Sequence, residues 1–361
     1  MERYLRPGQI FSLTNIEGTF EVREMIGRGA SCAVYRTYFC DSNGIRTEHL
    51  LKEYNPKGVE LYRDEEGVLH PRSPGAAAQF QAGLIQFQDG FSLQLHIRQE
   101  YPELTNSISN VERIYTGNGT KYVSMPWFQG QSYSQLQEKD LFELLRRIKA
   151  ITKTVGLYHA NGFLHLDIKP ENIYILPETA ELVMLFDFDS VVRKTDLSKA
   201  ISLSCTKTWA APEQLLPGHR YKICEATDLY AIGRILFHQL MGRHPVREEC
   251  RSFSTYQYDS ASNLLRDVNP QAFALLSEIL SHTICSDVSM RYQSAEELIE
   301  KLDDLAGKIV EVQKESSAQS ALEENTDLSG SFAQLLTVGE YNTAIMDLES
   351  GAVDAIAMDI F

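Results

Sequence analysis

Apolar and polar side chains alternate along the first part of the chain in a way that predicts β-strands. Residues 19–26 and 32–39 are rich in β-branched and aromatic side chains. The turn-forming sequence Asp-Ser-Asn-Gly at 41–44 precedes a third apolar segment at 45–54. We therefore expect three consecutive strands near the amino terminus.

A polar insert follows these strands and contains Pro56, Gly58, Pro71 and Pro74. Proline removes a backbone donor and disrupts both ladders and helices, so the insert is expected to form a loop. Apolar residues then recur every three or four positions over residues 76–99, which predicts a helix.

Helical spacing dominates the rest of the chain after one more strand at 121–125. The expected helices cover residues 140–159, 228–241, 270–285 and 294–306. Strands first and helices afterwards indicate an α+β protein with two lobes, and 361 residues suffice for a large core.

The last part of the chain has a different composition. Residues 314–331 are polar and are expected to form a linker. Residues 335–338 and 353–358 are expected to form strands. Between these strands we expect a helix that Asn342 caps and that ends at Gly351. Residues 341–359 resemble a piece of a bacterial amino-acid-binding (solute-binding) protein. Either this is a truncated fragment of that kind, or it is a strand–helix–strand appendage on the preceding lobes.

Charge and cysteine usage limit the function classes. The net charge is −15, and residues 315–361 contain nine acidic residues and no Lys or Arg, so residues 1–314 carry about −6. Non-specific binding of nucleic acid or anionic membrane needs basic surface, so neither is an expected partner. The six cysteines are scattered and form no metal-binding spacing, and no signal peptide or membrane span is evident. We expect a cytoplasmic protein with reduced thiols.

The strongest chemical signal is the sequence His165-Leu-Asp-Ile-Lys-Pro-Glu-Asn172. It brings an acid, a cation and an amide together, as phosphoryl transfer requires. The spacing Asp-x-x-x-x-Asn is that of a kinase catalytic loop. Here the chain resembles the eukaryotic-type (Hanks-type) serine/threonine protein kinases, and a bacterial member is expected. The resemblance implies Asp167 as the catalytic base, Lys169 as the phosphate-facing cation and Asn172 as a metal ligand.

The same resemblance extends into the first part of the chain, where it implies the ATP site. The glycine-rich sequence at 26–34 matches the family at Gly27, Gly29 and Val34, but Cys32 replaces the third glycine. Lys52 matches the strand lysine that pairs the α- and β-phosphates. The implied nucleotide-binding residues are Ile26, Gly27, Gly29, Val34, Lys52, Pro126 and Phe128, with Met125 as the gatekeeper.

Further motifs follow in the order of the family. Asp187-Phe188 matches the metal-binding Asp-Phe, and Asp189 in place of the usual glycine is interpreted as a buried residue that caps a turn. Thr206 matches a threonine that contacts the catalytic acid and lysine in serine/threonine kinases.

A second group of motifs is structural in the family. Ala211-Pro212-Glu213 matches the end of the activation segment, and Glu213 is expected to pair with Arg291. Asp228 matches the acid that holds the backbone of the catalytic loop.

The sequence departs from the family at other positions. No glutamate is found on residues 76–99 to hold Lys52, where Ser92 or Gln94 lies nearest the expected place. Leu166 replaces the arginine that binds a phosphorylated activation loop, which suggests activity without such phosphorylation.

The resemblance implies a bilobal protein-kinase fold of the α+β class. The expected domain limits are an extension at 1–17, a kinase domain at 18–306 (amino-terminal lobe 18–125, hinge 126–130, carboxy-terminal lobe 131–306), a linker at 307–331 and an appendage at 332–361.

The implied function is transfer of the γ-phosphoryl group of ATP, with Mg²⁺ or Mn²⁺, to Ser or Thr hydroxyls of a protein substrate. Two alternatives stay open: a pseudokinase that acts as a nucleotide-binding scaffold, which the missing glutamate favours, and a small-molecule kinase of the same fold.

Overall fold

The computed structural model divides into two compact units, and each is described by itself. The first contains Met1–Leu136 and Ala160–Thr206, and the second contains Gln137–His159 and Lys207–Phe361. The residues whose structure is described are 3–128, 130–138, 141–176, 183–199, 205–216, 218–250, 263–265, 270–306, 308–324, 332–350, 353 and 355–357.

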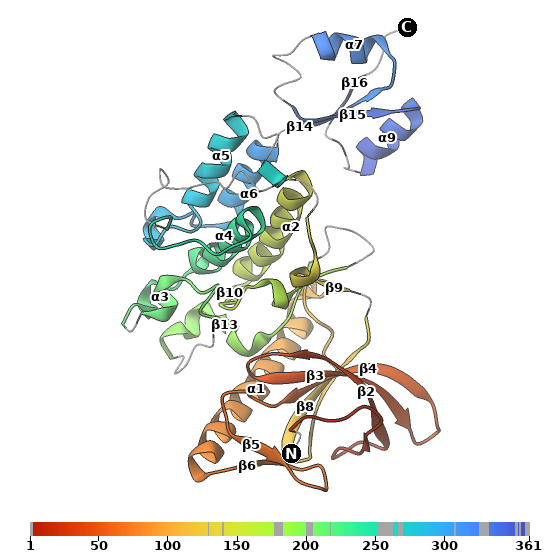
Figure 1. Ribbon diagram of the computed structural model, residues 1–361, viewed down its shortest axis with the longest axis vertical. Helices are drawn as coiled ribbons and strands as arrows, with labels where there is room; N and C mark the ends of the chain where they lie inside the picture. Colours follow the sequence, from red (N-terminus) through yellow and green to blue (C-terminus); the bar gives the residue numbers. More distant parts are fainter. Residues whose placement is uncertain are drawn as a thin grey trace. The chain divides into compact units, whose positions relative to one another are not determined.

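A six-stranded antiparallel sheet of order β1-β2-β3-β4-β8-β7 forms the framework of the first unit (Figure 1). The strands are β1 Ile10–Phe11, β2 Gly18–Arg28, β3 Cys32–Asp41, β4 Arg46–Tyr54, β7 Arg113–Gly117 and β8 Thr120–Pro126. The three predicted amino-terminal strands and the strand at 121–125 are confirmed. The sequence pattern missed β7 and the short β1, which adds part of the extension 1–17 to the sheet.

Both faces of this sheet are covered, because neighbouring residues along each strand enter different cores. Leu50 and Val123 pack in one core with Phe87 of the helix α1 (Pro74–Glu100). Leu51 and Tyr122 pack on the other face, in a core that includes residues of the amino-terminal extension. The predicted helix at 76–99 is confirmed. It begins earlier because Ser73 caps it and Pro74 occupies the first turn, where no backbone donor is needed.

The polar insert is not a loop throughout, and this expectation is wrong. It contains the hairpin of β5 (Leu61–Arg63) and β6 (Leu69–Pro71). Arg63 anchors this hairpin, since its Nη2 donates to Glu53 Oε1 of β4 at 2.5 Å. Glu53 is fully buried and also accepts hydrogen bonds from the hydroxyl groups of Tyr35 (3.0 Å) and Tyr122 (2.8 Å). A buried carboxylate requires such donors, and one of them comes from the insert.

The remainder of the first unit carries short strands that hold the loops of the candidate site. These are β9 Gln131–Ser132, β10 Phe163–Leu164, β11 Ile173–Ile175, β12 Val183–Leu185 and β13 Val192–Arg193. The pairs β11–β12 and β10–β13 are antiparallel. Short 3₁₀ helices occupy Pro102–Leu104, Tyr133–Gln135, Pro170–Asn172, Phe188–Ser190 and Lys194–Lys199.

The second unit is mainly helical up to residue 306. Its helices are α2 Leu141–Ala160, α3 Pro212–Leu215, α4 Glu225–Met241, α5 Pro270–Ser281 and α6 Ala295–Ala306. The last residue of α2, Ala160, belongs to the first unit. The helices predicted from spacing are confirmed, with boundaries shifted by a few residues; Asp140 lies outside the described residues. Short 3₁₀ helices occupy Arg220–Lys222, Asn263–Leu265 and Val288–Met290.

A buried ion pair and a buried contact between a histidine and an aspartate join segments that are distant in the sequence of this unit. Arg291 donates to both oxygens of Glu213, at 2.8 and 3.0 Å, so the predicted pairing is confirmed. His159 Nε2 lies 2.9 Å from Asp228 Oδ2. Bidentate arginine–carboxylate contacts such as the first add geometric specificity as well as energy.

The carboxy-terminal residues form a small parallel sheet of order β15-β14-β16, with α7 and α9 flanking it (Figure 1). Its elements are β14 Lys308–Gln313, α7 Ser317–Glu324, β15 Phe332–Val338, α9 Tyr341–Ser350 and β16 Ala355–Ala357. The prediction of a linker is therefore wrong for residues 308–324, which form β14 and α7. The buried side chains of Val312 and Leu322 pack in one cluster there. Asn342 lies inside α9 rather than capping it. Gly351 and residues 325–331 lie outside the described residues, and the solute-binding resemblance and domain limits stay predictions.

Among the described residues, no helix combines the length and apolar character needed to cross a bilayer.

The buried pair of Arg63 and Glu53 gives a stability prediction. Arg63→Ala should lower the free energy of unfolding by about 3 kcal/mol or more, because it leaves a buried carboxylate without its cation. Arg46→Ala, which removes an exposed pair with Glu21, should cost about 0–1 kcal/mol. Denaturant unfolding of both variants tests this, and equal losses would contradict the assigned role of Arg63.

Candidate active site

The register of the sheet places several predicted site residues in one row. Gly27 of β2 lies opposite Val34 of β3, which lies opposite Lys52 of β4, which in turn lies opposite Val123 of β8. Directly opposed residues of antiparallel strands project from the same face. Lys52 therefore emerges on the face that α1 covers, in line with the glycine-rich turn.

The turn between β2 and β3 contains the remaining residues of the glycine-rich segment. Gly29 N–H donates to the carbonyl of Cys32 at 2.9 Å and closes the turn. The Cys32 side chain is 4% exposed and lies in the core beside Leu50. Burial raises the pKa of this thiol well above its usual value. Cys32 lies two residues before Val34 on β3, so its side chain projects from the same face as Val34 and Lys52, where it is buried in the core.

The predicted catalytic residues converge between β10 and β11. Lys169 Nζ donates to Asp167 Oδ2 at 2.5 Å and to Thr206 Oγ1 at 2.8 Å. Thr206 N–H donates to Asp167 Oδ1 at 2.8 Å, and Asn172 Nδ2 donates to the Asp167 carbonyl at 3.0 Å. Each oxygen of the Asp167 carboxylate therefore has a fixed donor, and hydrogen bonds to Asp167 bring the four residues together.

Backbone contacts hold this loop in place. Phe186 N–H donates to the carbonyl of Asn172 at 2.9 Å, and His165 Nε2 lies 3.2 Å from the Phe186 carbonyl. Leu166, which replaces the family arginine, is 2% exposed and has a φ of 63°. A left-handed leucine costs about 1–2 kcal/mol, so the surrounding contacts must enforce this conformation.

Lys52 pairs directly with Asp187 across a distance of 2.9 Å between Nζ and Oδ1. Burial raises the pKa of Asp187, but the charge of Lys52 and its hydrogen bond outweigh that effect and lower the pKa to about 2. Burial correspondingly lowers the pKa of Lys52, and the nearby carboxylates raise it well above its usual value. Both groups are therefore ionised at neutral pH.

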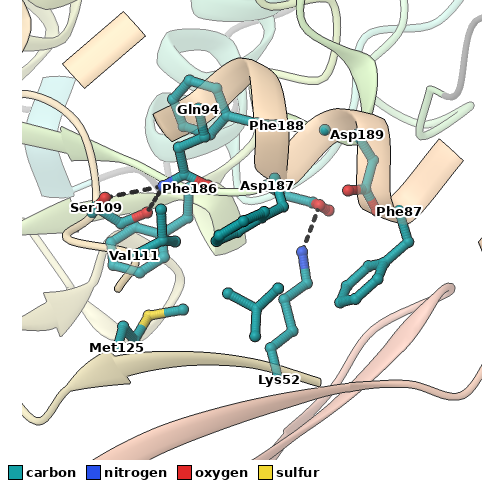
Figure 2. Close-up of a pocket in the computed structure, with 13 residues that line it drawn as sticks. Lys52, Phe87, Gln94, Ser109, Val111, Met125, Phe186, Asp187, Phe188 and Asp189 are labelled. Carbon is teal, nitrogen blue, oxygen red and sulfur yellow. Dashed lines mark hydrogen bonds and ion pairs between the residues drawn. The ribbon is translucent and has the colours of Figure 1, made fainter. Parts of the chain in front are cut away.

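Figure 2 shows the cavity into which Lys52 and Asp187 project, and α1 forms one of its walls. The helix contributes Phe87, Gly90, Phe91 and Gln94 to the lining. Gln94 donates from Nε2 to the carbonyl (2.9 Å) and hydroxyl (2.5 Å) of Ser109, and exposed Ser92 donates to a carbonyl of its own helix. Among the described residues that line the cavity, α1 thus supplies no acid to Lys52, as the sequence indicated.

Asp189 lies in the same cavity, and its interpretation as a turn-capping residue is wrong. No described hydrogen bond runs from a turn N–H to its carboxylate; α1 instead contacts its backbone, where Gln86 Nε2 donates to the Asp189 carbonyl at 3.1 Å. Burial, reinforced by the charge of Asp187, raises the pKa of Asp189 to about 7 despite the opposing charge of Lys52.

The hinge residues lie at the end of β8. Pro126 is the last residue of that strand, opposite His49, and Met125 lines the cavity. The Phe128 ring lies 5.4 Å from the Phe186 ring and 5.6 Å from the Tyr174 ring. Phe186 and Tyr174 lie 4.4 Å apart.

This aromatic cluster was missed by sequence reasoning. Phe186 and Tyr174 stand next to the metal and catalytic motifs, yet alternating apolar residues there are typical of ordinary strand positions. Gly90 was missed as well, although a glycine inside a long helix is a signal of close backbone approach.

Comparison with known proteins identifies a family for this chain. The family profile described as the protein kinase domain matches residues 96–321, well over half of the chain. The chain is 25% identical over 222 residues to serine/threonine-protein kinase D of Synechocystis sp., covering 60% of this chain and 42% of that protein.

Two further matches were found. The chain is 28% identical over 237 residues to serine/threonine-protein kinase PknD of Protochlamydia amoebophila, covering 55% of this chain and 23% of that protein. The chain therefore spans less than half the length of these curated relatives. The solved kinase domain of Mycobacterium tuberculosis PknI aligns with a TM-score of 0.49 at 18% identity, covering 84% of this chain and 100% of that chain.

The buried position of Cys32 gives a reactivity prediction. Because the thiolate is the reactive form, iodoacetamide should modify Cys32 at least about tenfold more slowly than the less buried Cys40. Peptide mass spectrometry of the folded protein over time measures both rates. Equal rates would show that the Cys32 side chain faces solvent in the turn between β2 and β3.

Proposed function

Because the chain belongs to the protein kinase family, we propose that it transfers the γ-phosphoryl group of ATP to serine or threonine hydroxyl groups of protein substrates. Family membership confirms the resemblance and the α+β kinase fold class predicted from the sequence. The observation that carries the proposed activity is the hydrogen-bonded cluster of Asp167, Lys169, Asn172 and Thr206.

Asp167 is suited to act as the general base. Lys169 and the Thr206 backbone each donate to one of its carboxylate oxygens, so the group has a fixed orientation. A positioned carboxylate that accepts the proton of an attacking hydroxyl group makes the oxygen a better nucleophile.

Lys169 supplies positive charge beside the base. Its ammonium group is shared between Asp167 and the Thr206 hydroxyl, which keeps it where charge would develop on the transferred phosphoryl group. The combination of Lys169 and Thr206 supports Ser or Thr rather than Tyr as the acceptor, by the resemblance to serine/threonine kinases.

The nucleotide is proposed to lie along the row from Gly27 to Lys52. Gly27 and Gly29 place no Cβ between the backbone of the turn and a phosphate group, and Lys52 would pair with the α- and β-phosphates. Ile26 and Val34 would contact the adenine ring of ATP, and the backbone of Pro126 and Phe128 would face the edge of that ring. These assignments rest on the resemblance and on the register of the sheet.

The donors present fit a hard divalent cation such as Mg²⁺ or Mn²⁺. Asp187 is ionised and projects into the cavity, and Asn172 uses its amide nitrogen on Asp167, which leaves its amide oxygen for a cation. Mg²⁺ commonly takes one or two carboxylates plus substrate phosphates. When bound, the ion neutralises phosphate charge.

A cytoplasmic location is also proposed, on the basis of six free cysteines, which suit a reducing compartment. No nucleic-acid partner is proposed, because the chain is acidic. The pseudokinase alternative draws on the absence of an α1 acid among the described residues of the cavity lining; the intact set of Asp167, Lys169, Asn172 and Asp187 supports an active enzyme instead.

The role of Asp167 can be tested directly. Asp167→Asn should reduce transfer of label from γ-labelled ATP to a generic protein substrate by about 10²-fold or more, because the general base is lost. Glu171→Gln, an exposed acid of the same loop, is the matched control and should retain wild-type activity. Wild-type protein that shows no transfer but is stabilised thermally by ATP would contradict the proposal and favour a scaffold.

The carboxy-terminal sheet should be dispensable for catalysis, since all residues with assigned roles precede it. A chain shortened to end at Ala306, which cuts no strand of that sheet, should keep the wild-type rate of phosphotransfer. Thermal unfolding establishes that the shortened chain is folded. Loss of activity in a folded shortened chain would assign the sheet a role in catalysis.

A further inference from the structure

The missing acid of α1 leaves Lys52 with an aromatic neighbour on that helix. The Nζ atom of Lys52 lies over the ring of Phe87, 5.6 Å from the ring centroid. Figure 2 shows this ring beside the ammonium end of Lys52, which also reaches Asp187. An ammonium group within about 6 Å of the centroid of an aromatic ring is attracted by the negative face of that ring. Phe87 thus gives α1 a contact with Lys52 that requires no carboxylate.

Packing fixes the position of the Phe87 ring. The side chain is 2% exposed and lies in the core that α1 shares with the sheet. Its ring centroid lies 5.5 Å from that of Tyr54. Tyr54 follows Lys52 by two positions in β4, so both side chains project from the same face of the sheet. The strand that carries the lysine therefore also carries a ring that supports Phe87.

Two glycines of α1 allow close packing on both sides of Phe87. A side-chain carbon added to Gly83 would overlap the hydroxyl group of Tyr54. One added to Gly90 would lie 2.9 Å from Asp189 Oδ1. The glycines lie one turn before and one turn after Phe87, and therefore on the same face of the helix. Glycine is unfavourable inside a helix, so each of the two has a packing reason here.

A ring face suits a lysine that shares its acidic partner. If the proposed function is right, Asp187 binds the metal ion that accompanies ATP, so its charge is then divided between that ion and Lys52. A hard divalent cation prefers oxygen ligands, and an aromatic ring offers none. The Phe87 ring can therefore attract the ammonium group without binding the metal ion.

We propose that Phe87 is the positioning residue for Lys52, and that its ring face replaces the helix glutamate that this chain lacks. The ring keeps the amine in the cavity, where it would meet the α- and β-phosphates of ATP. Gln94, which the sequence places near the position of the family acid, is bound to Ser109 instead.

The first test weakens the ring face while keeping the packing. Trifluorophenylalanine is incorporated in place of Phe87 in the full-length chain, because fluorine withdraws electron density from the ring and changes its shape little. The dissociation constant for ATP in MgCl₂, measured by isothermal titration calorimetry, should rise about threefold or more.

The same replacement of Phe80 is the matched control and should leave the affinity for ATP unchanged. The Phe80 ring also packs on Tyr54 in the same core, but it is not among the described residues that line the cavity. Thermal unfolding establishes that both proteins are folded. Wild-type affinity in the folded protein with the fluorinated ring in place of Phe87 would overturn the proposal.

A second test needs no nucleotide. In protein that contains lysine labelled with ¹³C at Cε, the signal of Lys52 is identified by its loss in Lys52→Arg. Phe87→Leu should move the Cε proton resonance of Lys52 downfield, because the ring current is lost, whereas Phe80→Leu should not. An unchanged resonance in folded Phe87→Leu would contradict the contact. Wild-type protein that binds no ATP would instead contradict the proposed function, and the resonance would still decide the position of Lys52.

Discussion

The ion pair between Lys52 and Asp187 is the contact on which the geometry of the site depends. It joins the sheet, through β4, to the segment that follows β12, with 2.9 Å between Nζ and Oδ1. The pairing of β3 with β4 determines the position of Lys52 on the sheet. The pairing of β11 with β12 determines the position of the segment that contains Asp187. Glu53, the next residue of β4, cannot replace Asp187 as the partner of Lys52, because adjacent residues of a strand point to opposite faces of the sheet.

Burial of charge explains why the other ionised groups occupy their positions. Glu53 is fully buried and is satisfied by Arg63 and two tyrosines, and Glu213 is satisfied by Arg291. Asp189 differs, because its carboxylate lies beside another carboxylate and its pKa is raised to about 7. Structural pairs are thus neutralised within the fold, whereas the cavity places two carboxyl groups beside one lysine. Shifted pKa values of this kind cluster at functional sites.

Much of the fold and the site could be predicted from the sequence, for identifiable reasons. Long periodic segments such as α1 and α2 are evident from their apolar spacing, and the sequence from His165 to Asn172 resembles a kinase catalytic loop, which implies phosphoryl-transfer chemistry. The hairpin β5–β6 could not be predicted, since its stability comes from the distant contact of Arg63 with Glu53.

Other parts were hidden from sequence reasoning by composition or by distance along the chain. Helix α7 was hidden by its polar composition, whereas β14 was missed although Ile309, Val310 and Val312 are β-branched residues typical of a strand. The place of Asp189 depends on Gly90, almost a hundred residues away, and no local pattern reveals such a contact.

The identity of the phosphorylated residue tests the central claim most directly. Substrate protein labelled with γ-labelled ATP is hydrolysed in acid, and its phosphoamino acids are separated. The arrangement of Lys169 and Thr206 around Asp167 predicts phosphoserine or phosphothreonine. Phosphotyrosine as the product would contradict the acceptor assignment and the interpretation of the site on which it rests.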